Sequence, residues 1–220
     1  MKSLFKYLRE PVSGLTHALG ALLSIVGLVL LLYEAVNAGK TYHFVAFLIF
    51  GISMFLLYTS SSLYHLLPVS ESVIQKLRKL DHSMIYVLIA GTYTPICLIL
   101  LDGGWRWGLF SAIWGLTAIG IIQKLFWMNA PRWLSTVFYL LMGWLAVIIF
   151  PKIYYLMPFG AFMWILIGGA AYTLGAIIYA IKKPDPLPNI FGFHEIWHLF
   201  VMAGTFSHFW AIYDYFTVLG

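Results

Sequence analysis

Residues 15–33 read LTHALGALLSIVGLVLLLY, nineteen residues without a single Asp, Glu, Lys or Arg. A helix of about 20 apolar residues crosses the hydrocarbon core of a bilayer. The stretch is too long for the apolar part of a signal peptide, and no small-residue cleavage site follows Tyr33. It therefore predicts a membrane helix that the mature chain retains.

Charge-free windows of this kind recur along the whole chain. They cover residues 11–33, 41–70, 82–101, 107–123, 133–151, 153–181 and 196–213. Each window is long enough for one helical crossing. The predicted fold is therefore an all-α integral membrane protein, a single domain over residues 1–220 that forms a seven-transmembrane-helix bundle. The expected helices are 15–34, 42–66, 81–101, 105–125, 132–150, 157–181 and 193–217.

Composition supports a membrane protein and excludes several other classes. Charged residues make up 10% of the chain and apolar residues 62%, whereas globular proteins carry about 25% charged residues. The one cysteine, Cys97, excludes an internal disulfide framework and a cysteine-based zinc cluster. The net charge of +5 lacks the basic run with interleaved aromatics that nucleic-acid binding would require. Membrane lipids are the expected surroundings, and the sequence indicates neither a protein partner nor an oligomeric state.

The basic residues between the windows predict how the chain is oriented. Three of the thirteen Lys and Arg residues, Lys40, Arg106 and Lys152, fall on one side. The other ten fall on the opposite side: Lys2, Lys6, Arg9, Lys76, Arg78, Lys79, Lys124, Arg132, Lys182 and Lys183. Short cytoplasmic loops carry an excess of Lys and Arg. We therefore expect a multi-pass protein of the cell membrane (inner or plasma membrane), with the N-terminus cytoplasmic and the C-terminus outside.

This orientation brings three histidines to one membrane depth, at the cytoplasmic face. His194 and His198 are four residues apart, so they project from one side of the last helix. His65 lies at the cytoplasmic end of the second helix. Three protein ligands together with a water are the pattern of a catalytic zinc site. The sequence predicts one bound metal ion, Zn²⁺, held by His65, His194 and His198.

Two further polar residues at this depth are predicted to be catalytic. Asp81 begins the third helix, where a buried charge is costly, and it would orient a water at the metal or accept its proton. Ser61, one helical turn before His65, would steady the water or an oxyanion. Simpler interpretations stay open, because a helix dipole would stabilise Asp81 and Ser61 would bond to its own helix backbone.

The remaining histidines near these helix ends are weaker candidates. His17, at the start of the first helix, either supports the metal ligands or packs in the bundle. His82 is expected to point about 100° away from Asp81 around the helix. His208 lies about 15 Å beyond His198 along the last helix and is not expected to be a ligand.

The segment HEIWH at 194–198 also fits H-E-x-x-H, the metalloprotease motif in which Glu is the general base. Intramembrane site-2 proteases resemble this pattern and take a third ligand from an Asp-Gly pair, for which Asp102 is the candidate here. Asp102 ends the third helix on the outer side, about 30 Å from the cytoplasmic helix ends. The predicted orientation therefore argues against a protease.

Four motifs resemble the hemolysin III family, the bacterial branch of the progestin and adipoQ receptor (PAQR) proteins. They are EPVSGLTH at 10–17, SSLYH at 61–65, LDH at 80–82 leading to AGTYTP at 90–95, and GFHEIWH at 192–198. The resemblance covers essentially the whole chain. It implies a seven-helix bundle with a cytoplasmic N-terminus and a zinc ion on His65, His194 and His198. It also implies that Asp81 contacts the zinc-bound water and that Ser61 is the motif serine.

The wider superfamily includes alkaline ceramidases, which hydrolyse a lipid amide. The resemblance therefore implies a zinc-dependent hydrolase of a ceramide-like amide that acts in membrane homeostasis, with enzymatic turnover left open. One alternative is a non-enzymatic sensor or regulator of membrane state with a structural zinc, and another is a hemolysin-like cytolytic protein. The chain lacks the long N-terminal domain of the animal receptors, so a protein-hormone receptor is not expected.

Overall fold

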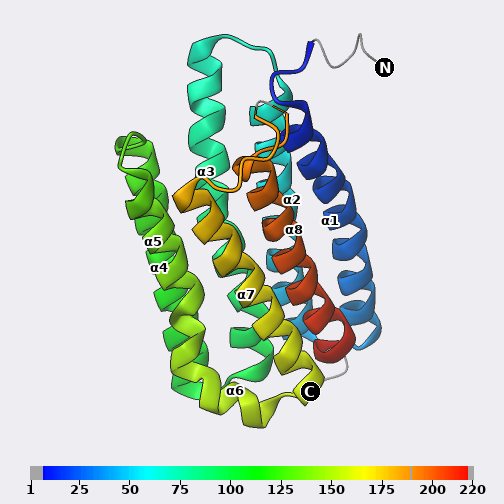
Figure 1. Ribbon diagram of the computed structural model, residues 1–220. Coiled ribbons are helices and arrows are strands. Elements are labelled where there is room, and N and C mark those ends of the chain that lie inside the picture. The colour runs from blue at the N-terminus through cyan, green and yellow to red at the C-terminus, as the bar shows by residue number, and fades with distance from the viewer. Residues whose placement is uncertain (1–6, 189, 218–220) are drawn as a thin grey trace.

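In the computed structural model, which describes residues 7–188 and 190–217, the chain folds into a bundle of helical rods (Figure 1). Six rods are long and apolar enough to cross a membrane. They are α1 (Pro11–Asn37), α2 (Thr41–Leu66), α3 (Glu71–Pro95) with η2 (Ile96–Leu100), α4 (Gly103–Phe126), α5 (Arg132–Trp144) with η3 (Leu145–Ile149) and α6 (Phe150–Leu156), and α7 (Phe159–Ile181). The prediction of an all-α membrane bundle is confirmed.

The seventh rod is α8 (Phe193–Ala211), which continues into η4 (Ile212–Phe216). It is not one of the six apolar spans, since polar side chains such as His194 and His198 lower its hydropathy. Its crossing of the membrane stays a prediction, as does the cytoplasmic N-terminus. Lys2 and Lys6, which contributed to the predicted orientation, lie outside the described residues, and so does the C-terminal Gly220.

Two helix bounds differ more than the others from those expected. The third helix begins at Glu71 rather than at 81, because its first ten residues (ESVIQKLRKL) form helix readily although they are too polar to lie in a bilayer core. The absence of charge marks the apolar span of a helix and not its first residue. The helix expected over 132–150 loses its regular α pattern near Pro151, whose missing N–H interrupts the hydrogen bonding, and the rod ends only at Leu156.

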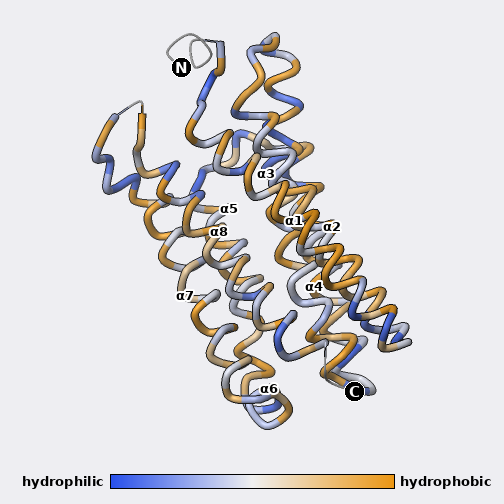
Figure 2. The backbone as a smooth tube through the Cα atoms, turned by 90° about the vertical axis from the view of Figure 1, so that its right-hand side faces the viewer, coloured by the Kyte–Doolittle hydropathy of each residue, from blue (hydrophilic) through white to orange (hydrophobic). Residues whose placement is uncertain are grey.

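The bundle exposes apolar side chains and buries polar ones, the arrangement expected of a protein surrounded by lipid. Leu22 and Ile148 are 64% and 63% exposed, whereas His17 and Lys124 are 2% and 3% exposed. Hydrophobic residues predominate along the rods, and many hydrophilic ones lie near their ends (Figure 2). The surroundings of the bundle are therefore membrane lipids.

The contact between α7 and α8 is close because small residues line it. A Cβ atom added to Gly168 would lie 2.3 Å from His208 Cδ2 and 3.1 Å from the Gly204 carbonyl oxygen. A Cβ atom at Gly175 would lie 2.8 Å from Phe200 Cβ. Small residues of this kind let membrane helices approach one another closely. This contact sets the position of α8, which carries two of the candidate metal ligands.

The start of α1 and the end of α8 lie at opposite ends of the bundle (Figure 1). Two contacts mark the end where α1 stops: Lys152 Nζ lies 2.8 Å from Asp102 Oδ1, and the Arg106 guanidinium lies 4.7 Å from the centre of the Tyr42 ring. At the end where α1 starts, the Lys79 ammonium donates to the Leu125 carbonyl oxygen at 2.8 Å. The candidate site lies at this second end.

Candidate metal centre

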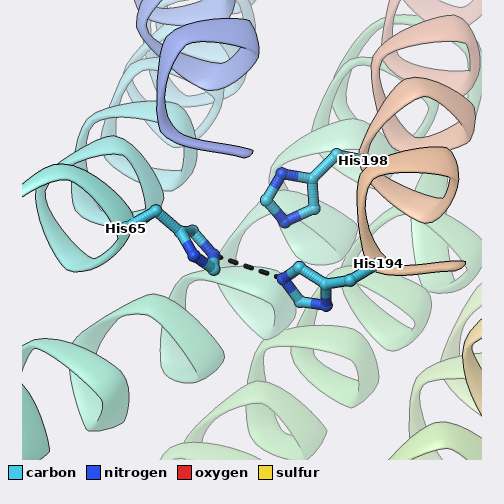
Figure 3. A group of neighbouring side chains, drawn as sticks. All are labelled: His65, His194 and His198. Carbon is cyan, nitrogen blue, oxygen red and sulfur yellow. Dashed lines mark hydrogen bonds between the residues drawn. The ribbon is translucent and has the colours of Figure 1, made fainter. Parts of the chain in front are cut away.

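The three histidines predicted to be metal ligands lie together at the start of α8 and the end of α2 (Figure 3). One ring nitrogen from each lies within 4.8 Å of the others. The Nε2 atoms of His65 and His194 are 3.3 Å apart, and the ring centre of His198 lies 4.6 Å from that of His194. All three rings are at least partly buried. The group could hold a metal ion.

Two of the three rings are hydrogen-bonded through Nδ1, which leaves their Nε2 atoms available for a metal ion. His198 Nδ1 lies 3.3 Å from the Ser13 carbonyl oxygen, which accepts its N–H, and His65 Nδ1 is paired with the Glu10 carboxylate. Histidine ligands usually donate their second N–H to a carboxylate or a carbonyl, which fixes the tautomer and leaves Nε2 for the metal. The donor set therefore fits a resident metal ion. Imidazole suits zinc, copper, iron and nickel, so the three rings indicate a transition metal without naming it.

Residues at the start of α1 make these hydrogen bonds to the histidines. The sequence interpretation assigned them no role. The Glu10 N–H also donates to the His65 carbonyl oxygen at 2.9 Å, which holds the chain before α1 against the end of α2. The hydrogen bond from His65 lowers the pKa of the Glu10 carboxyl to about 2, against the opposing effect of burial. The sequence could have indicated the pairing of Glu10 with His65. Glu10 is an acidic residue just before the first charge-free window, at the depth predicted for His65.

Glu10→Gln is expected to weaken zinc binding by about 10- to 100-fold, because the amide is a weaker acceptor for the His65 N–H than the carboxylate. Competition with a chromophoric chelator measures the dissociation constant. Glu34→Gln, near the opposite end of α1, is the matched control and should leave the constant unchanged. Equal constants in both variants would show that Glu10 does not support the ligand.

Glu195, the acid of the H-E-x-x-H segment, is engaged at the helix start. Its Oε2 accepts the Gly192 N–H at 2.8 Å, which caps α8, and its Oε1 accepts the Ser13 hydroxyl at 2.6 Å. Asp102 lies at the other end of the bundle, where the hydrogen bond from Lys152 lowers the pKa of its carboxyl. Glu195 is therefore not placed as the general base of a metalloprotease, and Asp102 is not placed as its third metal ligand. Both observations agree with the sequence interpretation.

Asp81, Ser61 and His17 line one cavity, and His17 also contacts the metal group. Asp81 is 6% exposed, and the Ser61 hydroxyl is buried with no hydrogen-bond partner among the described residues. The His17 ring stacks on His198 at 3.7 Å between ring centres, and neither of its nitrogens has a partner in the described chain. These unpaired polar atoms indicate a ligand or water at this position.

His82 contradicts the expectation that it points away from Asp81. Its Nδ1 lies 3.4 Å from Asp81 Oδ2 and 2.9 Å from the Arg78 carbonyl oxygen. Helical periodicity gives the direction of a Cα–Cβ bond, but rotation about the side-chain torsions lets two adjacent side chains meet. The Asp81 carboxylate is thus held by its own neighbour in the chain.

The cavity itself has a volume of about 650 Å³ and was not predicted. His17, Ser61 and Asp81 contribute polar groups to its lining. It extends between α3, α5, α7 and α8 along mostly apolar side chains, among them Leu88, Ile96, Leu166, Val201 and Ile212. A pocket of this size with few polar groups suits an apolar ligand.

Comparison with known proteins agrees with this arrangement. The chain matches the family model described as haemolysin-III related over residues 5–209. It is 40% identical to Hemolysin-3 of Bacillus cereus, over 98% of this chain and 95% of that protein, and 40% identical to a Hemolysin-3 homolog of Bacillus subtilis (strain 168), over 96% of each. The human monocyte to macrophage differentiation factor is 25% identical over 76% of this chain and 68% of its own length. With a bundle, a histidine group and nearly full-length similarity in agreement, the chain belongs to the haemolysin III family.

Proposed function

We propose that this protein is a zinc-dependent hydrolase of a membrane lipid, with a ceramide-like acyl amide as the substrate class, and that it acts in membrane homeostasis. The observation that carries the proposal is the apolar cavity beside the three histidines. His17 stacks on His198 and also lines this cavity, together with Asp81 and Ser61. A lipid chain in the cavity would place its head near the metal group.

The residues around the site can be given separate tasks. His65, His194 and His198 would hold the zinc, which supplies polarisation of a carbonyl and activation of water. Asp81 would take the proton of the attacking water and return it to the amine that leaves when the C–N bond breaks. The Ser61 hydroxyl would donate to the carbonyl oxygen as negative charge develops there. The apolar lining would orient the acyl chain and exclude bulk water.

We further propose that α8 is the seventh span and that the site faces the cytoplasm across the plasma membrane. Most of the described basic residues, including Arg78 and Lys79 on α3 and Arg132 on α5, lie toward the end of the bundle where α1 starts. That distribution supports a cytoplasmic location for this end by the positive-inside rule. Cysteine labelling of an exposed position such as Lys183→Cys, with a membrane-impermeant reagent on intact cells, tests it. Labelling before the cells are opened would contradict the proposal.

Fatty-acid release tests the hydrolase directly. Zinc-loaded protein in neutral micelles would be incubated with ceramides and other acyl amides, and the products measured by mass spectrometry. Release that depends on zinc supports the proposal. Stoichiometric zinc without release from any lipid of the panel would overturn it.

Gly169→Leu is expected to lower fatty-acid release by about tenfold or more, because the new side chain would enter the cavity and displace the acyl chain. Gly169 lines the cavity, and a Cβ atom there would meet nothing within 4 Å, so the fold should tolerate the change. Zinc content should stay unchanged. Gly115→Leu, equally unobstructed but outside the cavity, is the control. The same loss of activity in both variants would contradict a lipid in this cavity.

A structural metal in a membrane-state sensor is the second candidate function. Its support is that a bound ion would join α2 to α8, while Glu10 and Ser13 tie the same histidines to the start of α1. A cytolytic function is supported by the name of the Bacillus relatives alone. Leakage from liposomes that contain the purified protein would test that third possibility.

A further inference from the structure

Three basic side chains line the cavity from three different helices: Arg78 on α3, Lys124 on α4 and Arg132 on α5. Lys79, next to Arg78, donates to the Leu125 carbonyl oxygen at 2.8 Å, which joins the parts of α3 and α4 that carry Arg78 and Lys124. Lys124 in turn donates to the Ser135 hydroxyl on α5, the helix that begins at Arg132. The Arg132 guanidinium stacks over Tyr179, 4.7 Å from the ring centre. The three cations therefore belong to one region, and Arg78 lies less than one helical turn from Asp81. We call this region the basic entrance.

No carboxylate of the described chain forms an ion pair with the basic entrance. The described ion pairs use Glu10, Asp81 and Asp102, and their partners are Arg9, His65, His82 and Lys152. The nearest buried acid, Asp81, is paired with His82. The only side-chain partner of the Lys124 ammonium in the described structure is the Ser135 hydroxyl.

The burial of Lys124 is what distinguishes this region from ordinary basic loop residues. Lysines that anchor a membrane protein extend toward the lipid head groups and the water. Lys124 instead is 3% exposed and faces the cavity. A buried ammonium is costly unless a charged group compensates it, and the two arginines that line the same cavity increase the cost. The arrangement therefore calls for an anion that the chain does not supply.

We propose that the basic entrance binds the phosphate of an anionic phospholipid whose acyl chain lies in the apolar cavity. Arg and Lys side chains recognise phosphate through charge-assisted hydrogen bonds, and a guanidinium can contact two oxygens at once. A free phosphate would satisfy the cations but would leave the adjoining apolar lining without a ligand. The cavity continues from the basic entrance along Ile85, Ile89 and Ile96, which favours a lipid over an inorganic ion.

A phospholipid without an amide, such as phosphatidylglycerol, would be a ligand and not a substrate of the proposed amide hydrolase. The proposal refines the substrate class to an acyl-amide lipid with a negative head group. Its role as substrate rests on the proposed hydrolase, but its binding does not. His198→Ala, which removes a metal ligand, should keep the affinity for the lipid. Binding and turnover can therefore fail separately.

Native mass spectrometry of the full-length protein in a neutral detergent tests the binding. Phosphatidylglycerol, phosphatidylcholine with the same acyl chains and inorganic phosphate are the three probes. We expect phosphatidylglycerol to bind about tenfold or more tightly than phosphatidylcholine, and millimolar phosphate not to displace it. Equal affinity for both lipids would overturn the proposal. Displacement by phosphate alone would assign the site to a free anion and overturn it as well.

Lys124→Gln and Arg132→Gln should each weaken phosphatidylglycerol binding by about tenfold and leave phosphatidylcholine binding unchanged. Lys76→Gln is the control, because Lys76 is an exposed residue of α3 outside the cavity lining. Arg132 is exposed, so its variant carries the test if the buried Lys124→Gln fails to fold. The same loss in Lys76→Gln would indicate general surface attraction and would contradict a specific site.

Discussion

Purified His198→Ala protein is expected to contain less than about one tenth of a zinc ion per chain, whereas the wild type should contain about one. Removing one imidazole leaves two protein ligands, too few for a stable site. His65→Ala and His194→Ala should behave in the same way. Inductively coupled plasma mass spectrometry measures the metal, and the same spectrum identifies it.

His208→Gln is the control for this series, because His208 is a partly buried histidine of the same helix outside the metal group. Its Nε2 lies 3.1 Å from the Ile165 carbonyl oxygen, and glutamine can make a similar hydrogen bond. This variant should keep its zinc. Unchanged zinc content in all three alanine variants would refute the metal centre itself.

Asp81→Asn separates a hydrolase from a structural metal site. The amide has the shape of the carboxylate but cannot accept the proton of the attacking water, so lipid hydrolysis should fall by about 10²- to 10⁴-fold. Zinc content should stay at the wild-type level, because Asp81 is not one of the three ligands. Fatty-acid release and metal analysis on the same preparation measure both effects.

The opposite result is equally informative. If Asp81→Asn retains full function in cells while His198→Ala has none, the metal holds helices together and the sensor interpretation stands. Circular dichroism and the melting temperature must show that both variants fold. Loss of function in both, with the fold preserved, is the outcome that catalysis requires.

The bundle and the meeting of the histidines could be predicted because each depends on one-dimensional information. Charge-free windows give the helical rods of the bundle, and their up-and-down alternation places His65 and His194 at the same end of it. The first residue of α3 could not be found in this way, since the segment from Glu71 is helical without being apolar. Topology predicts the membrane depth of a residue, but it does not predict which residues lie beside it at that depth.

The supporting contacts and the cavity depend on three-dimensional packing. Glu10 and Ser13 reach the histidine rings because the chain before α1 runs along the end of α2, a path that no periodicity encodes. The cavity depends on how four helices diverge, and the orientation of His82 depends on side-chain torsions. Pattern arguments therefore located the candidate ligands, but the groups that hold these histidines in place came from the structure.

The bridge from Ser13 through Glu195 to Gly192 has a consequence for biogenesis. It joins the first helix of the chain to the last, and α8 also carries two of the three metal ligands. Chains emerge from the ribosome N-terminus first, so α1 and α2 enter the membrane long before α8 is made. Until then His65 lacks the other two histidines of the group, His194 and His198. The candidate metal centre is therefore complete only after the last helix has joined the first two.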